Sequence, residues 1–278
     1  MIKINNKLFK PEYFPDGTMK LVMDEIYDGK YYSIEWFYDS EDELLQLYYI
    51  VNNINESNSN PNIILFMPYI PNARFDRTKT YGEIFTLKYF ASFINHLCFD
   101  GVVVLDPHSY VSEALIDRIC ILDTLPLITK TIHNITYIQK DLTLFFPDEG
   151  STKRYKEVIE TFQNSPYAFG IKNRDWVTGE IKGLSVNGQV DQIKGRDVLI
   201  IDDICSKGGT FYHSAKKLKE LGAKNIYLYV SHCENSIYDG ELLKVSNNDL
   251  IKRIYTTDSI LTNLESPKIE LVEEWRTK

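Results

Sequence analysis

The sequence predicts an α/β protein with two doubly wound, mostly parallel sheets. Short apolar runs typical of buried strands alternate with amphipathic helical patterns along almost all of the 278 residues. Several of these runs end in loops that carry acids, arginines or glycines. Strand runs recur on both sides of a midpoint near residue 135, so we expect an N-terminal domain over 1–134 and a C-terminal domain over 135–278.

The composition is that of a soluble globular protein, with 44% hydrophobic and 25% charged residues. A net charge of -8 argues against non-specific binding to nucleic acid or to anionic membranes. No run approaches the roughly 20 apolar residues of a membrane span, and the N-terminus lacks a signal-peptide core, so we expect a cytoplasmic protein. The cysteines show no CxxC spacing, which indicates neither a zinc site nor a disulfide framework.

The first half contains predicted strands and helices in alternation. Strand-like runs lie at 18–23, 31–37, 62–67 and 101–105, and helical spacing at 41–54, 86–97 and 113–119. Polar clusters follow two of the strands. They are Arg74, Asp76 and Arg77 after the third strand, and Asp106 and His108 after the fourth.

The second half repeats this arrangement. Strands are expected at 136–138, 143–146, 167–171, 198–203, 225–230 and 251–256, with a helix over 151–165 and another after residue 210. Asp148 follows the second of these strands, and Lys172 and Arg174 open a polar excursion after the third.

The stretch from 198 to 228 carries the sharpest local signal. Its strand ends at Asp202 and Asp203, and a loop then leads directly into a helix. The loop consists of Ser206, Lys207, Gly208, Gly209 and Thr210. Glycines let backbone amides approach a phosphate at a helix N-terminus, and the two acids can accept hydrogen bonds from vicinal sugar hydroxyls or hold a cation through water. The pattern favours a sugar phosphate, although a tight turn whose glycines merely relieve strain would read the same way.

The strand-end clusters become more informative when they are taken together. Carboxyl ends of parallel strands meet at one edge of a sheet, so acids, an imidazole and several cations should converge at one edge or at two facing edges. Such a mixture is typical of phosphoryl-group chemistry with magnesium, in which catalysis depends on positioning and charge neutralisation.

The order of five motifs resembles that of the ribose-phosphate pyrophosphokinase (PRPP synthetase) family, of which the chain looks like a divergent, short member. These motifs are PYIPNARFDR, VVVLDPHS, FPDEG, IKNR and VLIIDDICSKGGT, and the similarity extends over about residues 14–262. The last motif alone would indicate only the wider phosphoribosyltransferase fold. The resemblance implies two related halves of phosphoribosyltransferase-like type. It also implies Mg²⁺-dependent transfer of the β,γ-diphosphate of ATP to the anomeric hydroxyl of ribose 5-phosphate, giving PRPP and AMP.

The resemblance also assigns residues on the ATP side. Phe14 and Asp16 match the family's adenine contacts, which cross a subunit interface, so the resemblance implies a homo-oligomer such as a dimer or hexamer. The ATP-side loop is matched by Arg74 and Asp76, with Arg77 beside them.

The remaining assignments concern the reacting groups and the acceptor. The resemblance gives magnesium and ribose contacts to His108 and Asp148, and a mobile catalytic loop to Lys172 and Arg174, with His108 counted among the catalytic residues. The ribose-hydroxyl acids are matched by Asp202 and Asp203, and the 5-phosphate loop by residues 206–210.

Three positions depart from the family pattern. Thr18 replaces a Glu, Phe75 replaces a Gln, and Ser206 stands where an Asp is common, with Lys207 adding a charge beside it. A diphosphate diester needs an open end and extra positive charge, so the loop leaves a larger acceptor such as ADP-ribose as an alternative to ribose 5-phosphate.

Two other classes of function stay open. A phosphoribosyltransferase would consume PRPP, but it would not need the PYIPNARFDR motif or Lys172 and Arg174. A non-catalytic regulatory subunit would not need the complete set of His108, both cations and both adjacent acids.

Overall fold

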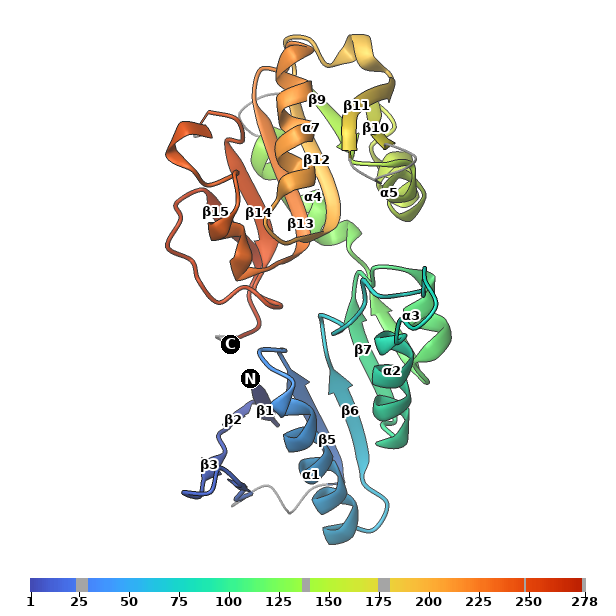
Figure 1. The fold of residues 1–278 in the computed structure, drawn as a ribbon, viewed down its shortest axis with the longest axis vertical. Helices are drawn as coiled ribbons and strands as arrows, with labels where there is room; N and C mark the ends of the chain where they lie inside the picture. The colour runs from blue at the N-terminus through green and yellow to red at the C-terminus, as the bar shows by residue number, and fades with distance from the viewer. Residues whose placement is uncertain (24–29, 137–140, 175–180, 248, 277–278) are drawn as a thin grey trace. The chain divides into compact units, whose positions relative to one another are not determined.

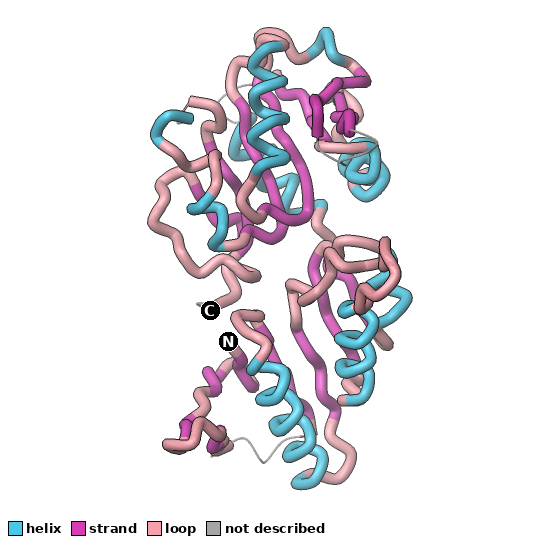
Figure 2. The backbone as a smooth tube through the Cα atoms, viewed as in Figure 1, coloured by secondary structure: helices cyan, strands magenta, loops and turns pink. Residues whose placement is uncertain are grey.

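The computed structural model describes residues 1–23, 30–136, 141–174, 181–247 and 249–276 (Figure 1). The chain forms two compact units, Met1–Asp123 and Thr124–Thr277. Both contain a mostly parallel sheet with helices packed on it, so the predicted α/β class is confirmed (Figure 2). No helix in the described ranges is long and apolar enough to cross a bilayer.

The first unit is built around one mixed sheet with strand order β2-β1-β5-β6-β7-β8. Strands β5 to β8 are parallel, whereas β1 pairs antiparallel with both β2 and β5. Its elements are β1 (Ile2–Ile4), β2 (Lys7–Phe9), β3 (Glu12–Tyr13), β4 (Met19–Lys20), β5 (Tyr31–Trp36), α1 (Asp42–Ser57), β6 (Asn62–Phe66), α2 (Thr86–His96), β7 (Gly101–Leu105), α3 (Tyr110–Leu115) and β8 (Ile119–Leu122).

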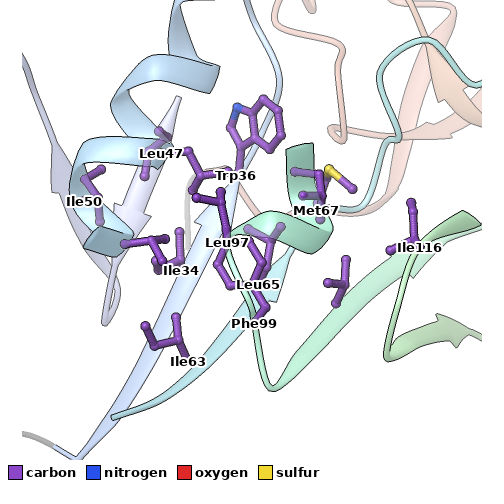
Figure 3. Close-up of a cluster of buried hydrophobic side chains, with 14 of the residues drawn as sticks. Ile34, Trp36, Leu47, Ile50, Ile63, Leu65, Met67, Leu97, Phe99 and Ile116 are labelled. Atoms are coloured by element: carbon purple, nitrogen blue, oxygen red, sulfur yellow. The ribbon is translucent and has the colours of Figure 1, made fainter. Parts of the chain in front are cut away.

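The core of the first unit lies between its sheet and the apolar faces of α1 and α2. Alternate residues of β5 and β6, such as Ile34 and Leu65, are fully buried in one cluster with Leu47 of α1 (Figure 3). Leu87 of α2 belongs to the same cluster. This alternation follows from the two-residue period of a strand whose one face meets the helices. The packed sheet holds the ends of β6 and β7, and therefore the loops that follow them, in fixed positions.

The second unit contains a sheet with strand order β11-β10-β9-β12-β13-β14-β15, parallel except for the β10–β11 pair. Its elements are α4 (Leu125–Thr136), β9 (Leu142–Phe146), α5 (Glu149–Arg154), α6 (Lys156–Thr161), β10 (Tyr167–Arg174), β11 (Ile181–Gly188), η1 (Val190–Gln192), β12 (Asp197–Cys205), α7 (Gly209–Glu220), β13 (Ile226–Cys233), η2 (Asn235–Asp239), η3 (Val245–Asn247), β14 (Arg253–Thr257) and β15 (Ile269–Glu273).

The central strands of the second sheet are buried on both faces. Every residue of β9 and of β13 is buried, and β12 is buried through its first five positions. Side chains of one face, including Ile200, pack with Phe211 of α7, and those of the other, including Leu199, pack with Ile132 of α4. Strands buried on both faces read as continuous apolar runs, which is why these were visible in the sequence.

Several element predictions need correction. The run 18–23 yields the two-residue strand β4, because it pairs only with β3 in a small hairpin. Helix α3 ends at Leu115 rather than near residue 119, where strand β8 begins instead. Thr136 belongs to helix α4, and the rest of the strand expected at 136–138 lies outside the described residues.

Helix α4 also bears on the division of the chain. The sequence places the domain boundary near residue 134, whereas the compact units divide between Asp123 and Thr124. Ile128, Ile132 and Ile135 of α4 pack in a core of the second unit together with Leu199 of β12. The helix therefore belongs physically to the sheet of the second unit.

Candidate functional site

Asp202 and Asp203 lie near the carboxyl end of β12, the strand between β9 and β13. Successive strand residues point to opposite faces, yet both positions are largely enclosed: Asp203 is 3% exposed, and the Asp202 side chain is 16% exposed. The central position of β12 thus places two adjacent acids in a poorly hydrated environment.

A cation and a hydroxyl from the preceding β9–α5 segment contact both acids. Arg154 Nη1 lies 2.7 Å from Asp203 Oδ1 and 4.0 Å from Asp202 Oδ1. The Ser151 hydroxyl donates to Asp202 Oδ1 at 3.0 Å, and the Ser151 backbone N–H donates to Asp148 Oδ1 at 3.0 Å, which caps α5. The structure therefore brings together three predicted acids, Asp148, Asp202 and Asp203, through Ser151 and Arg154.

The electrostatics of this cluster follow from its burial. Burial raises the pKa of the Asp202 carboxyl well above its usual value, and the negative charge of Asp203 raises it further. Arg154 lowers that pKa and Asp148 raises it. Because burial and the charge of Asp203 both oppose ionisation of Asp202, hydroxyl donors or a cation bound at the cluster would stabilise its ionised form.

The predicted phosphate loop connects β12 to α7 within the same unit. Gly208 adopts a left-handed conformation with φ 74°, and a Cβ there would lie 2.5 Å from Leu242 Cδ1. At Gly209, the first residue of α7, a Cβ would meet nothing within 4 Å. The first turn of α7 holds no acid, so its N-terminal amides and helix dipole favour an anion at this open position.

Other loop side chains differ in their environments. Lys207 is exposed and Thr210 is half-buried. The Ser206 hydroxyl donates to Glu234 Oε2 at 2.7 Å and lies 3.1 Å from the Ser236 hydroxyl. Glu234, which the sequence analysis did not identify as a site residue, therefore contacts the loop.

The residues predicted for ATP lie in the first unit. Arg74 and Arg77 are exposed in the loop after β6, and Arg77 Nε lies 3.8 Å from Asp76 Oδ1. The loop turns at Asn72, whose φ of 64° is left-handed, and the Phe75 N–H donates to the Asn72 carbonyl at 2.9 Å. This turn presents both guanidinium groups to solvent at the end of the strand.

His108 is half-buried in the turn between β7 and α3. Asp106 before it is buried, with a left-handed φ of 40°, a conformation that Asp adopts more readily than most residues. The strained turn directs the chain from β7 into α3, whose Ncap residue is Ser109. Arg77 and His108 thus follow neighbouring parallel strands of one sheet.

Phe14 and Asp16 lie on the β3–β4 hairpin. The Thr18 backbone N–H and hydroxyl donate to Asp16 Oδ1 at 3.0 and 2.7 Å, and these bonds lower the pKa of Asp16. Phe14 is 51% exposed, and its backbone N–H donates to the Thr18 carbonyl at 2.9 Å. Thr18, a departure from the family pattern, therefore holds Asp16 in a tight turn while the Phe14 ring stays accessible.

Lys172 and Arg174 are at the end of β10, opposite Leu184 and Ile181 of β11. Their side chains, and residues 175–180, lie outside the described part of the structure. Their predicted roles in catalysis are carried forward on the resemblance alone.

The described oxygen-bearing side chains show how Mg²⁺ could be held. Within the described ranges no group of three or more His, Cys, Asp or Glu side chains forms a metal cage. Mg²⁺ bound to a nucleotide uses one or two carboxylates and the substrate's phosphates, and the Asp148 carboxylate is an oxygen ligand of that kind. His108 belongs to the first unit and Asp148 to the second.

Sequence reasoning missed four residues of the site. Ser151 and Arg154 follow Asp148 by three and six residues, a spacing that places them in the turns that Asp148 caps. This spacing from a helix cap could have identified Ser151 and Arg154 from the sequence. Glu234 and Ser236 reach the loop through the pairing of β12 with β13, which no local pattern reveals.

The fold and this site define a class of protein: a two-unit α/β protein with an acid pair and a phosphate-type loop at the end of one central strand. No family model matches the chain. It is 26% identical to the ribose-phosphate pyrophosphokinase of Sulfurisphaera tokodaii, over 94% of this chain and 85% of that protein. It is 27% identical to that of Saccharolobus solfataricus, over 84% of this chain and 77% of that protein.

A solved structure agrees with these relatives. The phosphoribosylpyrophosphate synthetase of Mycobacterium smegmatis superposes with a TM-score of 0.78 over 96% of this chain and 86% of that one, at 18% identity. At that identity the match shows the fold. The chain is thus similar in sequence to ribose-phosphate pyrophosphokinases and shares the fold of a phosphoribosylpyrophosphate synthetase.

The glycine loop offers a matched pair of substitutions. Gly208→Ala should lower the unfolding free energy by at least about 1 kcal/mol, because the left-handed φ and the contact with Leu242 both oppose a Cβ. Gly209→Ala should leave the melting temperature nearly unchanged, since its Cβ points into open space, yet weaken phosphate binding in the loop. Thermal unfolding and calorimetric titration with ribose 5-phosphate measure both effects. Equal melting temperatures for the two variants would contradict this account of the loop.

Asp202→Asn should raise the melting temperature of the ligand-free protein at neutral pH. The raised pKa means that Asp202 stabilises the fold when protonated and loses that contribution as the pH rises through its folded value. The asparagine still accepts the hydrogen bond from Ser151 but carries no charge. The difference in melting temperature between the variant and the unsubstituted protein should therefore shrink as the pH is lowered toward the pKa of Asp202 in the unfolded chain. The expected rise is about 2–4 °C for each kcal/mol gained, measured by calorimetry from acid to neutral pH. A lower melting temperature at neutral pH would show that the charge is stabilising.

Proposed function

We propose that this protein is an ATP-dependent pyrophosphokinase that transfers the β,γ-diphosphate of ATP to the anomeric hydroxyl of ribose 5-phosphate, giving PRPP and AMP. The observation that carries the proposal is the placement of a buried acid pair and an open phosphate loop at the end of one strand, β12. The names of the similar proteins support it independently.

The acceptor fits the second unit. Asp202 and Asp203 accept hydrogen bonds from the vicinal 2- and 3-hydroxyls of the ribose, which relieves the repulsion between the two carboxylates. The amides at the start of α7 bind the phosphate. A ribose held at both ends has its anomeric hydroxyl fixed in position, and such fixing lowers the entropic part of the barrier.

The transfer itself breaks one bond and forms one. The anomeric oxygen bonds to the β-phosphorus of ATP, the bond from that phosphorus to the oxygen bridging the α-phosphate breaks, and AMP leaves with the bridging oxygen. The hydroxyl proton passes to solvent or to a nearby base. Mg²⁺, when bound with ATP, neutralises charge on the phosphate oxygens.

The first unit supplies the ATP side of the proposal. Arg74 and Arg77 neutralise phosphate charge with Asp76 beside them, and His108 contacts the reacting phosphates. Phe14 and Asp16 bind adenine in a neighbouring subunit of a homo-oligomer. Lys172 and Arg174 stabilise charge on the transferred group.

A larger acceptor of the ADP-ribose type is the second candidate. Two observations favour it: Lys207 of the loop is exposed, and the Glu234 carboxylate lies against Ser206. A phosphate esterified at its outer oxygen carries less charge than a terminal phosphate, and its extension requires the open end that Gly209 provides.

The deciding experiment combines the protein with Mg²⁺, ATP and either ribose 5-phosphate or ADP-ribose, and identifies the products by mass. We expect AMP to form only when an acceptor is present, and one acceptor to gain a diphosphate. Release of inorganic pyrophosphate from added PRPP in the presence of a nucleobase, with transfer of the phosphoribosyl group to that base, would instead indicate a phosphoribosyltransferase. Gain of a diphosphate by neither acceptor would contradict the proposal.

A further inference from the structure

Glu234 is an acid at the phosphate loop that takes no part in the proposed transfer to ribose 5-phosphate. Its Oε2 atom accepts hydrogen bonds from Ser206 at 2.7 Å and from Ser236 at 2.9 Å. The two serine hydroxyls also lie 3.1 Å apart, which completes a three-membered cluster. Ser206 belongs to the loop, so the carboxylate borders the position proposed for the acceptor's phosphate.

The fold holds Glu234 in this place. Cys205 and Cys233 are opposite each other in the β12–β13 ladder, and the Glu234 backbone N–H donates to the Cys205 carbonyl at 2.8 Å. Glu234 is also the Ncap residue of η2, and the segment after η2 approaches the loop closely. A Cβ on Gly240 would lie 1.8 Å from the Lys207 carbonyl oxygen. The backbone on both sides of the carboxylate is therefore packed against the loop.

A carboxylate at this position distinguishes between classes of phosphate. A terminal phosphomonoester carries a charge of about -1.5 to -2 near neutral pH, and a neighbouring carboxylate repels it. A phosphate esterified on both sides carries about one negative charge. A carboxylate is also an acceptor for hydroxyl groups, which a sugar attached beyond that phosphate would supply.

We propose that Glu234 is a specificity-determining residue that disfavours a terminal 5-phosphate and favours a ribose whose 5-phosphate is esterified to a hydroxyl-bearing group. This inference rests on the proposed transfer of a diphosphate to an anomeric hydroxyl, and at the same site it selects the esterified acceptor, the second candidate, over ribose 5-phosphate. Ser206 and Ser236 keep the carboxylate oriented toward the loop.

The test is Glu234→Gln, assayed with ribose 5-phosphate and with ADP-ribose as the esterified probe. The glutamine oxygen still accepts from both serines, so the substitution removes charge while keeping the local hydrogen bonds. We expect kcat/KM for ribose 5-phosphate to rise by about tenfold and kcat/KM for ADP-ribose to fall. An unchanged ratio of the two values, or a parallel change in both, would overturn the inference.

Two further variants isolate the cause. Glu220→Gln removes the same charge at the opposite end of α7, where Glu220 pairs with Lys217, and should leave the ratio unchanged. Ser236→Ala keeps the charge but removes one hydrogen bond to it, and should shift the ratio in the same direction by a smaller factor. If Glu220→Gln shifts the ratio of the two kcat/KM values as much as Glu234→Gln does, the effect comes from net charge, and the proposed role of Glu234 is overturned.

A binding measurement separates this inference from the proposed function. If no variant forms AMP with either acceptor, the proposed function fails. Calorimetric titration with ribose 5-phosphate then still tests Glu234. About tenfold tighter binding to Glu234→Gln than to the unsubstituted protein supports the inference, whereas equal affinity, or no binding to either protein, overturns it.

Discussion

The structure of the second unit depends on how two adjacent carboxylates, Asp202 and Asp203, are accommodated on a strand that is buried on both faces. Enclosing like charges in a medium of low polarity is unfavourable unless donors or cations compensate them. Arg154 and Ser151 supply part of that compensation, and both come from the segment that Asp148 caps. The β9–α5 connection is therefore as important to the site as β12 itself.

The buried acid cluster also determines which ligand suits the site. Because burial raises the pKa of Asp202, its ionised form is stabilised by a ligand that brings hydroxyl groups or a cation, and part of the stability of the ligand-free protein is exchanged for affinity. The loop beside it has the opposite character, with backbone amides at the start of α7 that favour an anion. A ribose phosphate satisfies both demands in one molecule, and Glu234 then limits which phosphates are accepted.

How much of this could be predicted from the sequence depends on the range of the interactions. The run from Val198 through the glycine loop was readable because strand, acids, loop and helix are contiguous, and each element leaves a local pattern. Strands β8 and β15 were missed because each is only four or five residues long. Helix α4 was missed although Ile128, Ile132 and Ile135 recur at helical spacing.

The contacts that refine the site come from strand register rather than from local pattern. Ser206 meets Glu234 across 28 positions of the chain because Cys205 and Cys233 are paired in the sheet. Ser151 reaches Asp202 across 51 positions because β9 and β12 are neighbours. Such pairs are set by tertiary packing, and a single sequence does not encode them in a form that periodicity or motif spacing can reveal.

The most direct test of the central claim is to compare the acceptor that receives the diphosphate with its 2-deoxy analogue. If Asp202 and Asp203 bind the vicinal hydroxyls of a ribose, loss of one hydroxyl leaves a buried carboxylate oxygen without its donor. We predict that kcat/KM falls by at least about 10²-fold for the 2-deoxy compound. Equal kcat/KM for the two compounds would contradict the assignment of the acid pair to the ribose.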